Sequence, residues 1–433
     1  MICMNLHQVS SITGGTLIGK PILFRGICTD SRKDCRGRLF VALSGENFNG
    51  EDYCQQAMDN GAVGVLVSHS IDLNIPQLIC ENTLTALSVL AKNWAKQCNT
   101  KIIAITGSNG KTTVKNMVHS IFSISNQCSA TTGNLNNEIG VPLTLCNINS
   151  EDAFAVIEMG AAKLGDISWL VSLVNIHTAA ITNVSAAHIG RFESFDNIVS
   201  EKGQIISRLG ENDFAILPID DDHYDFWKEK TISKILSFGE HSLADISTDS
   251  IKHIQLPVAG KHNKVNAACA AAIAQSCNIS AEDIKQGLEA FVPAAGRLEN
   301  LGKINGNIVI NDSYNANPQS VKAAIDVLAD YDTTTTLVLG DMAELGDDSE
   351  TLHKEIGQYA LDKNITHVFT IGKHSKNTSI AFSNDAKHFD SIDSLKSHLL
   401  ENWNQLGTIL IKGSRSMYLE KLVEGLIHSE KVT

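Results

Sequence analysis

The segment 101–122 constrains the fold of this chain more than any other. It begins with apolar residues at 102–105, which predict a buried strand. Apolar residues at 114, 117, 118, 121 and 122 then recur with the spacing of one helix face. A buried strand, a glycine-rich loop and a helix form the context that a phosphate-binding loop requires. The loop between strand and helix consists of Gly107, Ser108, Asn109, Gly110, Lys111, Thr112 and Thr113.

The residue types of this loop suit a nucleotide. Glycines let the backbone approach a phosphate, and the helix N-terminus directs free N–H groups and partial positive charge at it. Lys111 would reach the β/γ-phosphates, and the Thr112 hydroxyl would bind Mg²⁺. An ordinary glycine turn is the alternative, but a lysine and two threonines after the second glycine fit no ordinary turn. A strict Walker A motif has its first glycine at position 105, whereas here it is Gly107, so we predict a variant loop.

Length and composition predict an ordinary globular α/β chain with about three domains, which we place at residues 1–82, 83–296 and 297–433. With 35 basic and 48 acidic residues, the net charge is −13. This charge argues against nucleic acid and anionic membranes as partners. The ten cysteines form no CxxC pair, and no apolar run is long enough to cross a membrane. We therefore expect a cytoplasmic protein with reduced, buried cysteines.

In the first unit, residues 39–43 and 64–67 predict short buried strands, and residues 53–60 a short helix. The polar loop 28–33 contains a serine and an arginine that could hold a phosphate or a sugar. A solvated turn explains this loop equally well.

The second unit continues from a helix at 84–95 and the phosphate loop to an amide-rich loop at 131–140. A buried strand follows, with Glu158 at its carboxyl end, where doubly wound sheets bind ligands. Glu158 could hold Mg²⁺ there, or it could simply face solvent. The strand 176–184 leads to His188, Lys202 is predicted to lie at the start of a helix, and residues 267–274 predict a further helix. A lone histidine or lysine at such a place is more often structural than functional.

The third unit is another α/β sheet, with strands predicted at 308–310, 336–339, 368–371 and 409–411. Asn317 is predicted to cap a helix that begins at Pro318. Three of these strands end in polar residues. The chain as a whole is predicted to combine a small α/β domain, a central phosphate-loop ATPase-like doubly wound domain and a C-terminal Rossmann-like domain.

Together, the phosphate loop, the Glu158 strand and the His188 loop resemble the Mur ligases, the ATP-dependent amide ligases of peptidoglycan precursor synthesis. The segments 133–143, 311–318, 339–346 and 412–416 resemble in particular the member that joins D-alanyl-D-alanine to UDP-N-acetylmuramoyl tripeptide. The resemblance covers essentially the whole chain. It implies a UDP-substrate domain, an ATP domain and a ligase domain, an acyl-phosphate intermediate, two Mg²⁺ ions and a monomer.

The resemblance also implies roles for individual residues. Catalysis would fall to Lys111, His188, Lys202 and Arg297. ATP would bind the phosphate loop together with Asn263, Arg297, Asp312 and Tyr314. Mg²⁺ would bind Thr112, Glu158, His188 and Lys202, the last carbamylated by CO₂, because a carbamate is an anionic ligand whereas a free ammonium is repelled by cations. Substrate contacts would come from Asp30, Ser31, Arg32, Gly45, Phe48, Asn134, Asn136, Asn137, Ser414 and Arg415.

One departure from the family pattern lies close to the metal loop, where Glu193 stands at a position usually held by glycine. Two other functions are alternatives. A sister ligase that adds a different amino acid, or glutamate to folate, is disfavoured by the segments 134–142 and 412–415. A nucleotide-dependent switch would hydrolyse ATP without ligation, and phosphate release that requires both substrates would exclude it.

Overall fold

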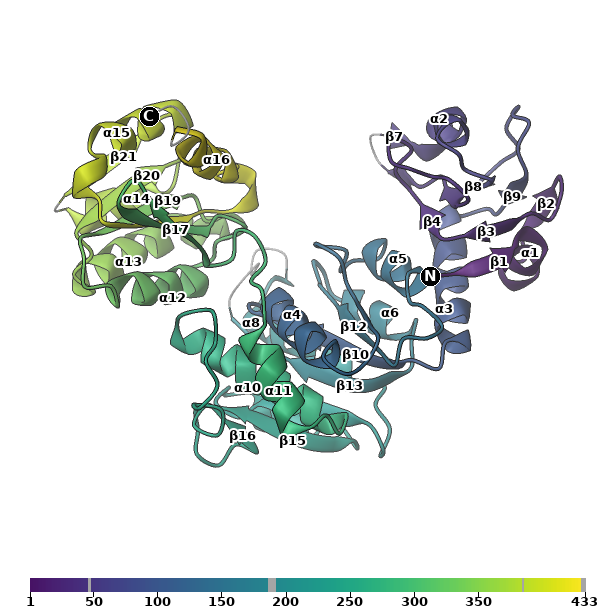
Figure 1. The fold of residues 1–433 in the computed structure, drawn as a ribbon, viewed down its shortest axis with the longest axis horizontal. Coiled ribbons are helices and arrows are strands. Elements are labelled where there is room, and N and C mark those ends of the chain that lie inside the picture. Colours follow the sequence, from purple (N-terminus) through teal and green to yellow (C-terminus); the bar gives the residue numbers. More distant parts are fainter. Residues whose placement is uncertain (46–47, 186–191, 384, 430–433) are drawn as a thin grey trace.

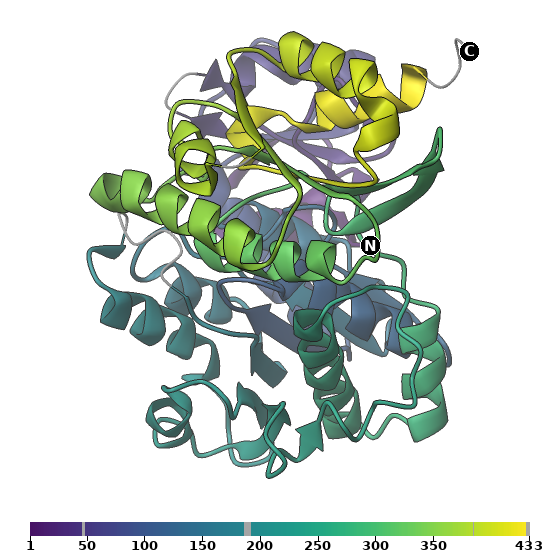
Figure 2. The ribbon, with the colours of Figure 1, turned by 90° about the vertical axis from the view of Figure 1, so that its left-hand side faces the viewer.

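The computed structural model describes residues 1–45, 48–185, 192–383 and 385–429. Its three main sheets belong to three lobes (Figure 1), and the first and third lobes stand on either side above the middle lobe. In the view turned by 90° (Figure 2), the third lobe lies in front of the first. The predicted α/β class is confirmed. The domain boundaries after residues 82 and 296 stay predictions.

The first lobe contains a five-stranded sheet, order β2-β9-β8-β5-β4, and two small two-stranded sheets, β1-β3 and β6-β7. Its strands are β1 Cys3–Asn5, β2 Thr16–Ile18, β3 Leu23–Arg25, β4 Ile27–Cys28, β5 Leu39–Val41, β6 Ser44–Gly45, β7 Phe48–Asn49, β8 Gly64–Val67 and β9 Gln77–Ile79. Its helices are α1 Leu6–Thr13, the 3₁₀ turn Gly50–Tyr53 and α2 Cys54–Asp59. The strand expected at 39–43 is thus shorter than predicted.

The middle lobe is a seven-stranded parallel sheet with the order β11-β12-β10-β13-β14-β15-β16. Its strands are β10 Lys101–Thr106, β11 Cys128–Ala130, β12 Phe154–Glu158, β13 Ile176–Ile181, β14 Phe214–Pro218, β15 Lys234–Gly239 and β16 Ile246–Ser247. Its helices are α3 Thr83–Gln97, α4 Lys111–Phe122, α5 Gly140–Cys146, α6 Asp166–Val171, α8 Phe195–Gly203, α9 Tyr224–Lys228, α10 Lys261–Ser276 and α11 Ala281–Glu289, and a 3₁₀ turn spans Gln204–Ile206.

Helices cover both faces of this sheet, which explains the uninterrupted apolar run in β10. Ile102 and Ala104 belong to the core beneath α3 and α5, whereas Ile103 and Ile105 belong to the core beneath α4 and α10. Successive side chains of a strand point to opposite faces, so a strand buried on both sides needs apolar residues at every position. All five apolar positions predicted on the helix face of α4 are buried.

The order of the middle sheet places a ligand site at β10. The chain fills one side of β10 with β11 and β12 and then the other side with β13. Ligands of open parallel sheets bind outside the carboxyl ends of the strands at such a reversal. The phosphate loop follows β10, and Glu158 is the last residue of β12, so both lie at this reversal.

The third lobe is a six-stranded sheet with the order β17-β18-β22-β19-β20-β21, in which only β17 is antiparallel. Its strands are β17 Glu299–Ile304, β18 Asn307–Asp312, β19 Thr335–Gly340, β20 His367–Ile371, β21 Ala386–Phe389 and β22 Thr408–Lys412. Its helices are α12 Pro318–Ala329, α13 Ser349–Asp362, α14 Lys376–Phe382, α15 Ile392–Glu401 and α16 Glu420–Ser429, and 3₁₀ turns span Gly346–Asp348, Trp403–Gln405 and Arg415–Met417. The four strands predicted here are confirmed.

One prediction about a helix was wrong. Lys202 does not lie at a helix start but in the last turn of α8. The helix begins at Phe195 because the Ser194 side chain caps it by accepting a hydrogen bond from the Asn197 N–H. The other helix predictions hold, and α10 begins six residues earlier than predicted, at Lys261. None of the described helices is long and apolar enough to cross a membrane.

Candidate active site

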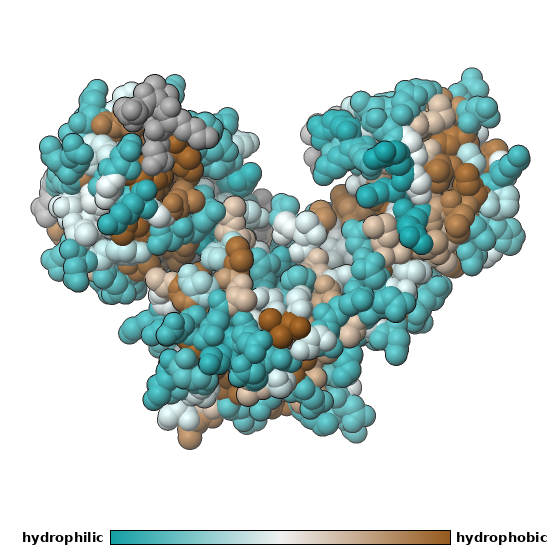
Figure 3. All heavy atoms as spheres, viewed as in Figure 1, coloured by the Kyte–Doolittle hydropathy of each residue, from teal (hydrophilic) through white to brown (hydrophobic). Residues whose placement is uncertain are grey.

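A cavity of about 1290 Å³ lies between the middle lobe and the third lobe. These two lobes form the floor and the left side of the hollow seen in Figure 3. The predicted site residues that line the cavity are Gly107, Ser108, Asn109, Gly110, Lys111, Thr112, Thr113, Asn134, Asn136, Asn137, Glu158, Lys202, Asn263, Arg297, Asp312 and Tyr314. These residues come from the middle lobe, from the third lobe and from the linker at residues 290–298 between them. The fold thus brings together residues that are more than two hundred positions apart in sequence.

The phosphate loop has the backbone that its glycines predict. Gly107 and Gly110 have φ angles of 151° and 79°, which other residues rarely adopt. A Cβ atom at Gly107 would collide with the Thr182 hydroxyl, and one at Gly110 with the Asn266 amide. Thr182 also donates a hydrogen bond to the Asn109 carbonyl (2.6 Å), which fixes the loop to the residue directly after β13.

The Lys111 ammonium lies against this loop. It donates to the carbonyls of Gly107 (2.7 Å) and Ser108 (3.2 Å). Burial lowers the pKa of Lys111, the Glu158 charge raises it, and the Arg297 charge lowers it. An anion bound in the loop would offset this burial, so the site favours a negatively charged ligand.

Glu158 is held from three directions at the floor of the cavity. Its Oε2 accepts from the Thr112 hydroxyl (2.8 Å), and its Oε1 accepts from the Asn136 amide (2.8 Å). Its backbone N–H donates to the Thr131 hydroxyl (2.9 Å). A hydroxyl and a carboxylate at this distance are the hard oxygen ligands that Mg²⁺ takes together with water and phosphate oxygens. The donor set therefore fits the predicted ion.

Lys202 is 6% exposed and lines the same cavity. Burial lowers the pKa of Lys202 to about 7, with a smaller contribution from the Lys111 charge. The neighbouring Glu201 accepts from the N–H groups of Gly165 (2.8 Å) and Ile167 (2.7 Å), which fixes the end of α8 against α6. Lys202 is thus a buried amine that is partly neutral at pH 7.

The fourth predicted metal ligand, His188, lies outside the described residues. Glu193, which follows this segment, has a φ angle of 65°. A left-handed backbone favours glycine, so the family pattern of glycine at this position has a structural reason.

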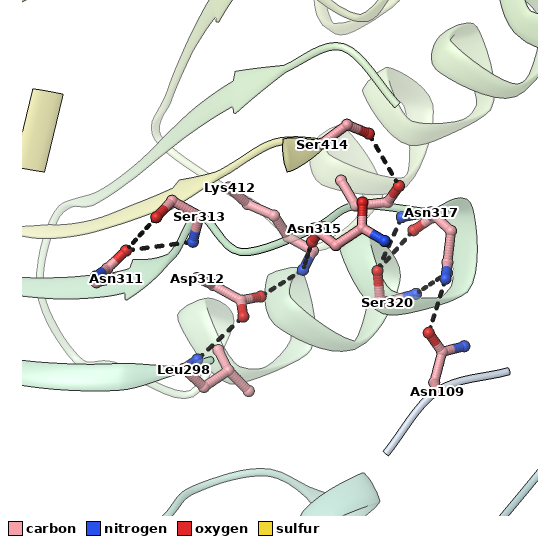
Figure 4. Close-up of polar contacts among 11 residues, drawn as sticks. Asn109, Leu298, Asn311, Asp312, Ser313, Asn315, Asn317, Ser320, Lys412 and Ser414 are labelled. Carbon is pink, nitrogen blue, oxygen red and sulfur yellow. Dashed lines mark hydrogen bonds and ion pairs between the residues drawn. The ribbon is translucent and has the colours of Figure 1, made fainter. Parts of the chain in front are cut away.

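On the opposite side, Asp312 ends β18 directly beside Lys412, which ends β22 (Figure 4). Asp312 accepts from the Lys412 ammonium (2.6 Å) and from the Leu298 N–H (3.0 Å). Lys412 also donates to the Asn315 carbonyl (3.0 Å). No role was predicted for Lys412 from the sequence, although this residue is the last of a strand that was predicted to end in polar residues. The pair fixes the linker at Leu298 to the third sheet.

Cation–π contacts bring three predicted residues together beside the cavity. The Arg297 guanidinium lies 4.1 Å from the centre of the Tyr314 ring, and the Arg415 guanidinium lies 5.9 Å from it. Cations attract the face of an aromatic ring, so the tyrosine holds Arg297 in place. Across the cavity, buried Asn263 is fixed by donating to the Ala259 carbonyl (2.7 Å).

The remaining predicted substrate residues do not line the cavity. Asp30 and Arg32 form an exposed ion pair (2.8 Å), and Arg32 lowers the pKa of Asp30 to about 2. Ser31 donates to Gln56 (2.6 Å), and Gly45 pairs with Phe48 in the hairpin β6-β7. Ser414 accepts from the Ala343 N–H (2.7 Å) in the third lobe.

The phosphate loop contacts the third lobe directly. Asn109 accepts from the Asn317 amide (2.7 Å) and donates to Gln319 (2.9 Å), as Figure 4 shows for the first contact. Asn317 was predicted as a helix cap, and its Oδ1 does cap α12 by accepting from the Ser320 N–H (2.9 Å). The contact between lobes could not be predicted, because it depends on how the lobes sit.

Comparison with known proteins agrees with this geometry. The family model for the Mur ligase middle domain matches residues 105–274, and the model for the Mur ligase, glutamate ligase domain matches residues 296–415. The chain belongs to the Mur ligase family. The first match falls on the phosphate loop, Glu158 and Lys202, and the second on Arg297 and Asp312. The Mur ligase models thus cover both sides of the cavity.

Full-length Mur ligase relatives are similar as well. The UDP-N-acetylmuramoyl-tripeptide--D-alanyl-D-alanine ligase of Escherichia coli (strain K12) is 38% identical, with 98% of this chain and 99% of the relative covered. The enzyme of the same name from Haemophilus influenzae is 36% identical, with coverage of 98% and 99%. A crystal structure of MurF from Acinetobacter baumannii superposes with a TM-score of 0.91, 32% identity and 99% coverage of both chains.

Proposed function

We propose that this protein is an ATP-dependent ligase that joins D-alanyl-D-alanine to UDP-N-acetylmuramoyl tripeptide. The observation that carries the proposal is the cavity of about 1290 Å³ between the phosphate loop of the middle sheet and the strand ends of the third sheet. The relatives, which match over nearly the whole chain, are named for these substrates. We also propose the three-domain division at residues 1–82, 83–296 and 297–433.

The reaction has two steps. The terminal carboxylate of the tripeptide attacks the γ-phosphorus of ATP, which forms an acyl phosphate and breaks the bond to ADP. The free amine of D-alanyl-D-alanine then attacks the acyl carbon, loses a proton and expels phosphate. Lys111, at the loop, and Arg297, held on Tyr314, would stabilise the charge of the transferred phosphoryl group. The protein contributes mainly position and charge.

Two further elements of the site belong to the proposal. Thr112 and Glu158 would hold one Mg²⁺, and His188 with carbamylated Lys202 a second; these ions neutralise phosphate charge when bound. A buried amine whose pKa is about 7 is nucleophilic at neutral pH, so its nitrogen can attack CO₂ and release a proton to give a carbamate. The carbamate would replace a repulsive cation by an anionic ligand.

Substrate contacts are assigned by lobe. The UDP end would bind Asp30, Ser31, Arg32, Gly45 and Phe48. The exposed ring of Phe48 lies beside that of Tyr53, with 6.4 Å between the ring centres. The amide loop with Asn134, Asn136 and Asn137 would bind the peptide, and Ser414 and Arg415 the incoming amine. Ten free cysteines support a reducing, cytoplasmic location. We propose that the protein acts as a monomer.

The test is a panel of UDP-muramoyl peptides and amine acceptors, scored by ADP release. We expect release only when ATP, the tripeptide and D-alanyl-D-alanine are all present, and an amide product of matching mass. Release without the amine would indicate a hydrolase or a switch. Release with a single amino acid in place of the dipeptide would indicate a sister ligase.

A further inference from the structure

Lys115 is a buried lysine that the reaction above does not use. It lies on α4, is 4% exposed, and is absent from the described residues that line the cavity. Lysine is almost never buried this deeply without a partner, because the ammonium loses its hydration. An apolar residue would fill this helix position at lower cost, so packing alone does not explain the charge.

The ammonium of Lys115 is directed at one atom. It donates to the carbonyl of Thr131 at 2.7 Å, and it forms no ion pair within the described part of the chain. Burial lowers the pKa of Lys115, the Glu158 charge raises it, and the Arg297 charge lowers it. The positive charge of Lys115 thus lies within electrostatic reach of Glu158, while its ammonium is bonded to Thr131.

Thr131 is the point where three parts of the site meet. Its N–H donates to the Val156 carbonyl (3.0 Å) in β12, and its hydroxyl accepts from the Glu158 N–H (2.9 Å). It also begins the amide loop, whose Asn136 donates to Glu158 at 2.8 Å. A shift of Thr131 would move the start of the amide loop relative to the carboxylate.

We propose that Lys115 is a positioning residue that fixes the amide loop 131–140 against the phosphate helix and so determines the affinity for UDP-N-acetylmuramoyl tripeptide. It acts through Thr131 and touches neither nucleotide nor peptide. The inference rests on the proposed function, because it assigns the amide loop to the peptide substrate. It explains why a charged side chain occupies a buried position of α4.

The experiment compares Lys115→Met, Lys115→Arg and Thr131→Val with the parent enzyme. Lys115→Met keeps the length and removes the charge, and Thr131→Val removes the hydroxyl but keeps the carbonyl. We expect Lys115→Met and Thr131→Val to raise the KM for UDP-N-acetylmuramoyl tripeptide about tenfold while the KM for ATP stays within about twofold. Lys115→Arg keeps a donor and a charge and should recover most of the affinity.

Val118→Ala is the matched control, because Val118 is fully buried on the same helix and only packs. It should lower the thermal stability of α4 without changing the ratio of the two KM values. If Lys115→Met does not fold, Lys115→Gln, which also removes the charge but keeps a donor of shorter reach, carries the test. The proposal is overturned if a folded variant leaves the tripeptide KM unchanged, or raises both KM values in step.

Calorimetric binding of the tripeptide to the same variants separates this proposal from the proposed function. If the parent binds UDP-N-acetylmuramoyl tripeptide and Lys115→Met binds it about tenfold more weakly, the positioning role stands regardless of the amine acceptor. If the parent itself does not bind the peptide, the proposed function fails first.

Discussion

Asn109 at the tip of the phosphate loop and Asn317 at the cap of α12 are joined by a hydrogen bond of 2.7 Å across 208 residues of sequence. The backbone of Asn109 is fixed within the middle lobe, since its N–H donates to the Asn183 side chain (2.9 Å). The side chain of Asn109 is hydrogen-bonded to Asn317 and Gln319 of the third lobe. The residue that would sense phosphate therefore also touches the lobe that would close over it.

The first prediction concerns this contact. Asn109→Ala removes the hydrogen bonds to Asn317 and Gln319, which together contribute about 1 kcal/mol at a partly exposed site. The equilibrium constant between the lobe arrangement that has this contact and arrangements that lack it should therefore shift about fivefold toward the latter. Small-angle scattering without nucleotide should give a broader distance distribution than the parent. Gln319→Ala, which removes one of the contacts, should have an intermediate effect. Unchanged scattering from both variants would mean that these contacts do not hold the third lobe in place.

The second prediction concerns Lys111. Lys111→Ala removes a charge that would act on the γ-phosphate in the transition state, so kcat should fall by about three orders of magnitude. The melting temperature should not decrease, because a buried ammonium is lost. Lys163→Ala is the control, since Lys163 is an exposed lysine at the cavity wall. Activity of Lys111→Ala within about tenfold of the parent would rule out the assigned phosphate site.

The local features of the site could be predicted from the sequence because they depend on neighbouring residues. The loop at 107–113 is defined by its own glycines, and Glu158 by its place at the end of an apolar run. Asn317 caps α12 through a bond to Ser320, only three residues away. Each of these interactions is settled within one turn or one strand.

The parts that could not be predicted are non-local. Lys412 meets Asp312 only because β22 inserts between β18 and β19, which places two strand ends side by side across one hundred residues. The prediction that Lys202 lies at a helix start was wrong for a different reason. The cap at Ser194 lies eight residues earlier, and Phe195, Ile198 and Val199 after it already have the spacing of one helix face, so the sequence itself carries the signal for the true helix start.

The third prediction is a pH dependence of stability at His353, which is fully buried. Its Nε2 accepts from the Met342 N–H (3.0 Å), and its Nδ1 lies 2.6 Å from the Ser349 carbonyl, so the ring is neutral with the proton on Nδ1. Burial lowers the pKa of His353. Below the ordinary histidine pKa, the unfolded chain binds a proton that the folded chain does not. Stability is therefore retained above about pH 6.5 and lost as pH falls below it.

This loss can be measured as the free energy of unfolding between pH 5 and pH 8. The parent should lose up to about 1.4 kcal/mol per pH unit more than His353→Gln, whose amide oxygen can still accept from Met342 but cannot titrate. His7→Gln is the control, because His7 is exposed. Parallel curves for the parent and His353→Gln would mean that His353 does not titrate in this range.

The last prediction is that Lys202 acts as a carbamate. Its pKa of about 7 leaves much of the amine neutral at pH 7 to 8, whereas an exposed lysine remains protonated there. With ¹³C-bicarbonate, a carbamate signal in the NMR spectrum should rise between pH 6 and pH 8. Lys202→Arg should lose both that signal and the activity, since arginine keeps the charge but cannot take up CO₂. Lys202→Ala should also be inactive, and added acetate should restore part of its activity by supplying a carboxylate. Parental activity in Lys202→Arg would show that the side chain acts as a cation or has no role.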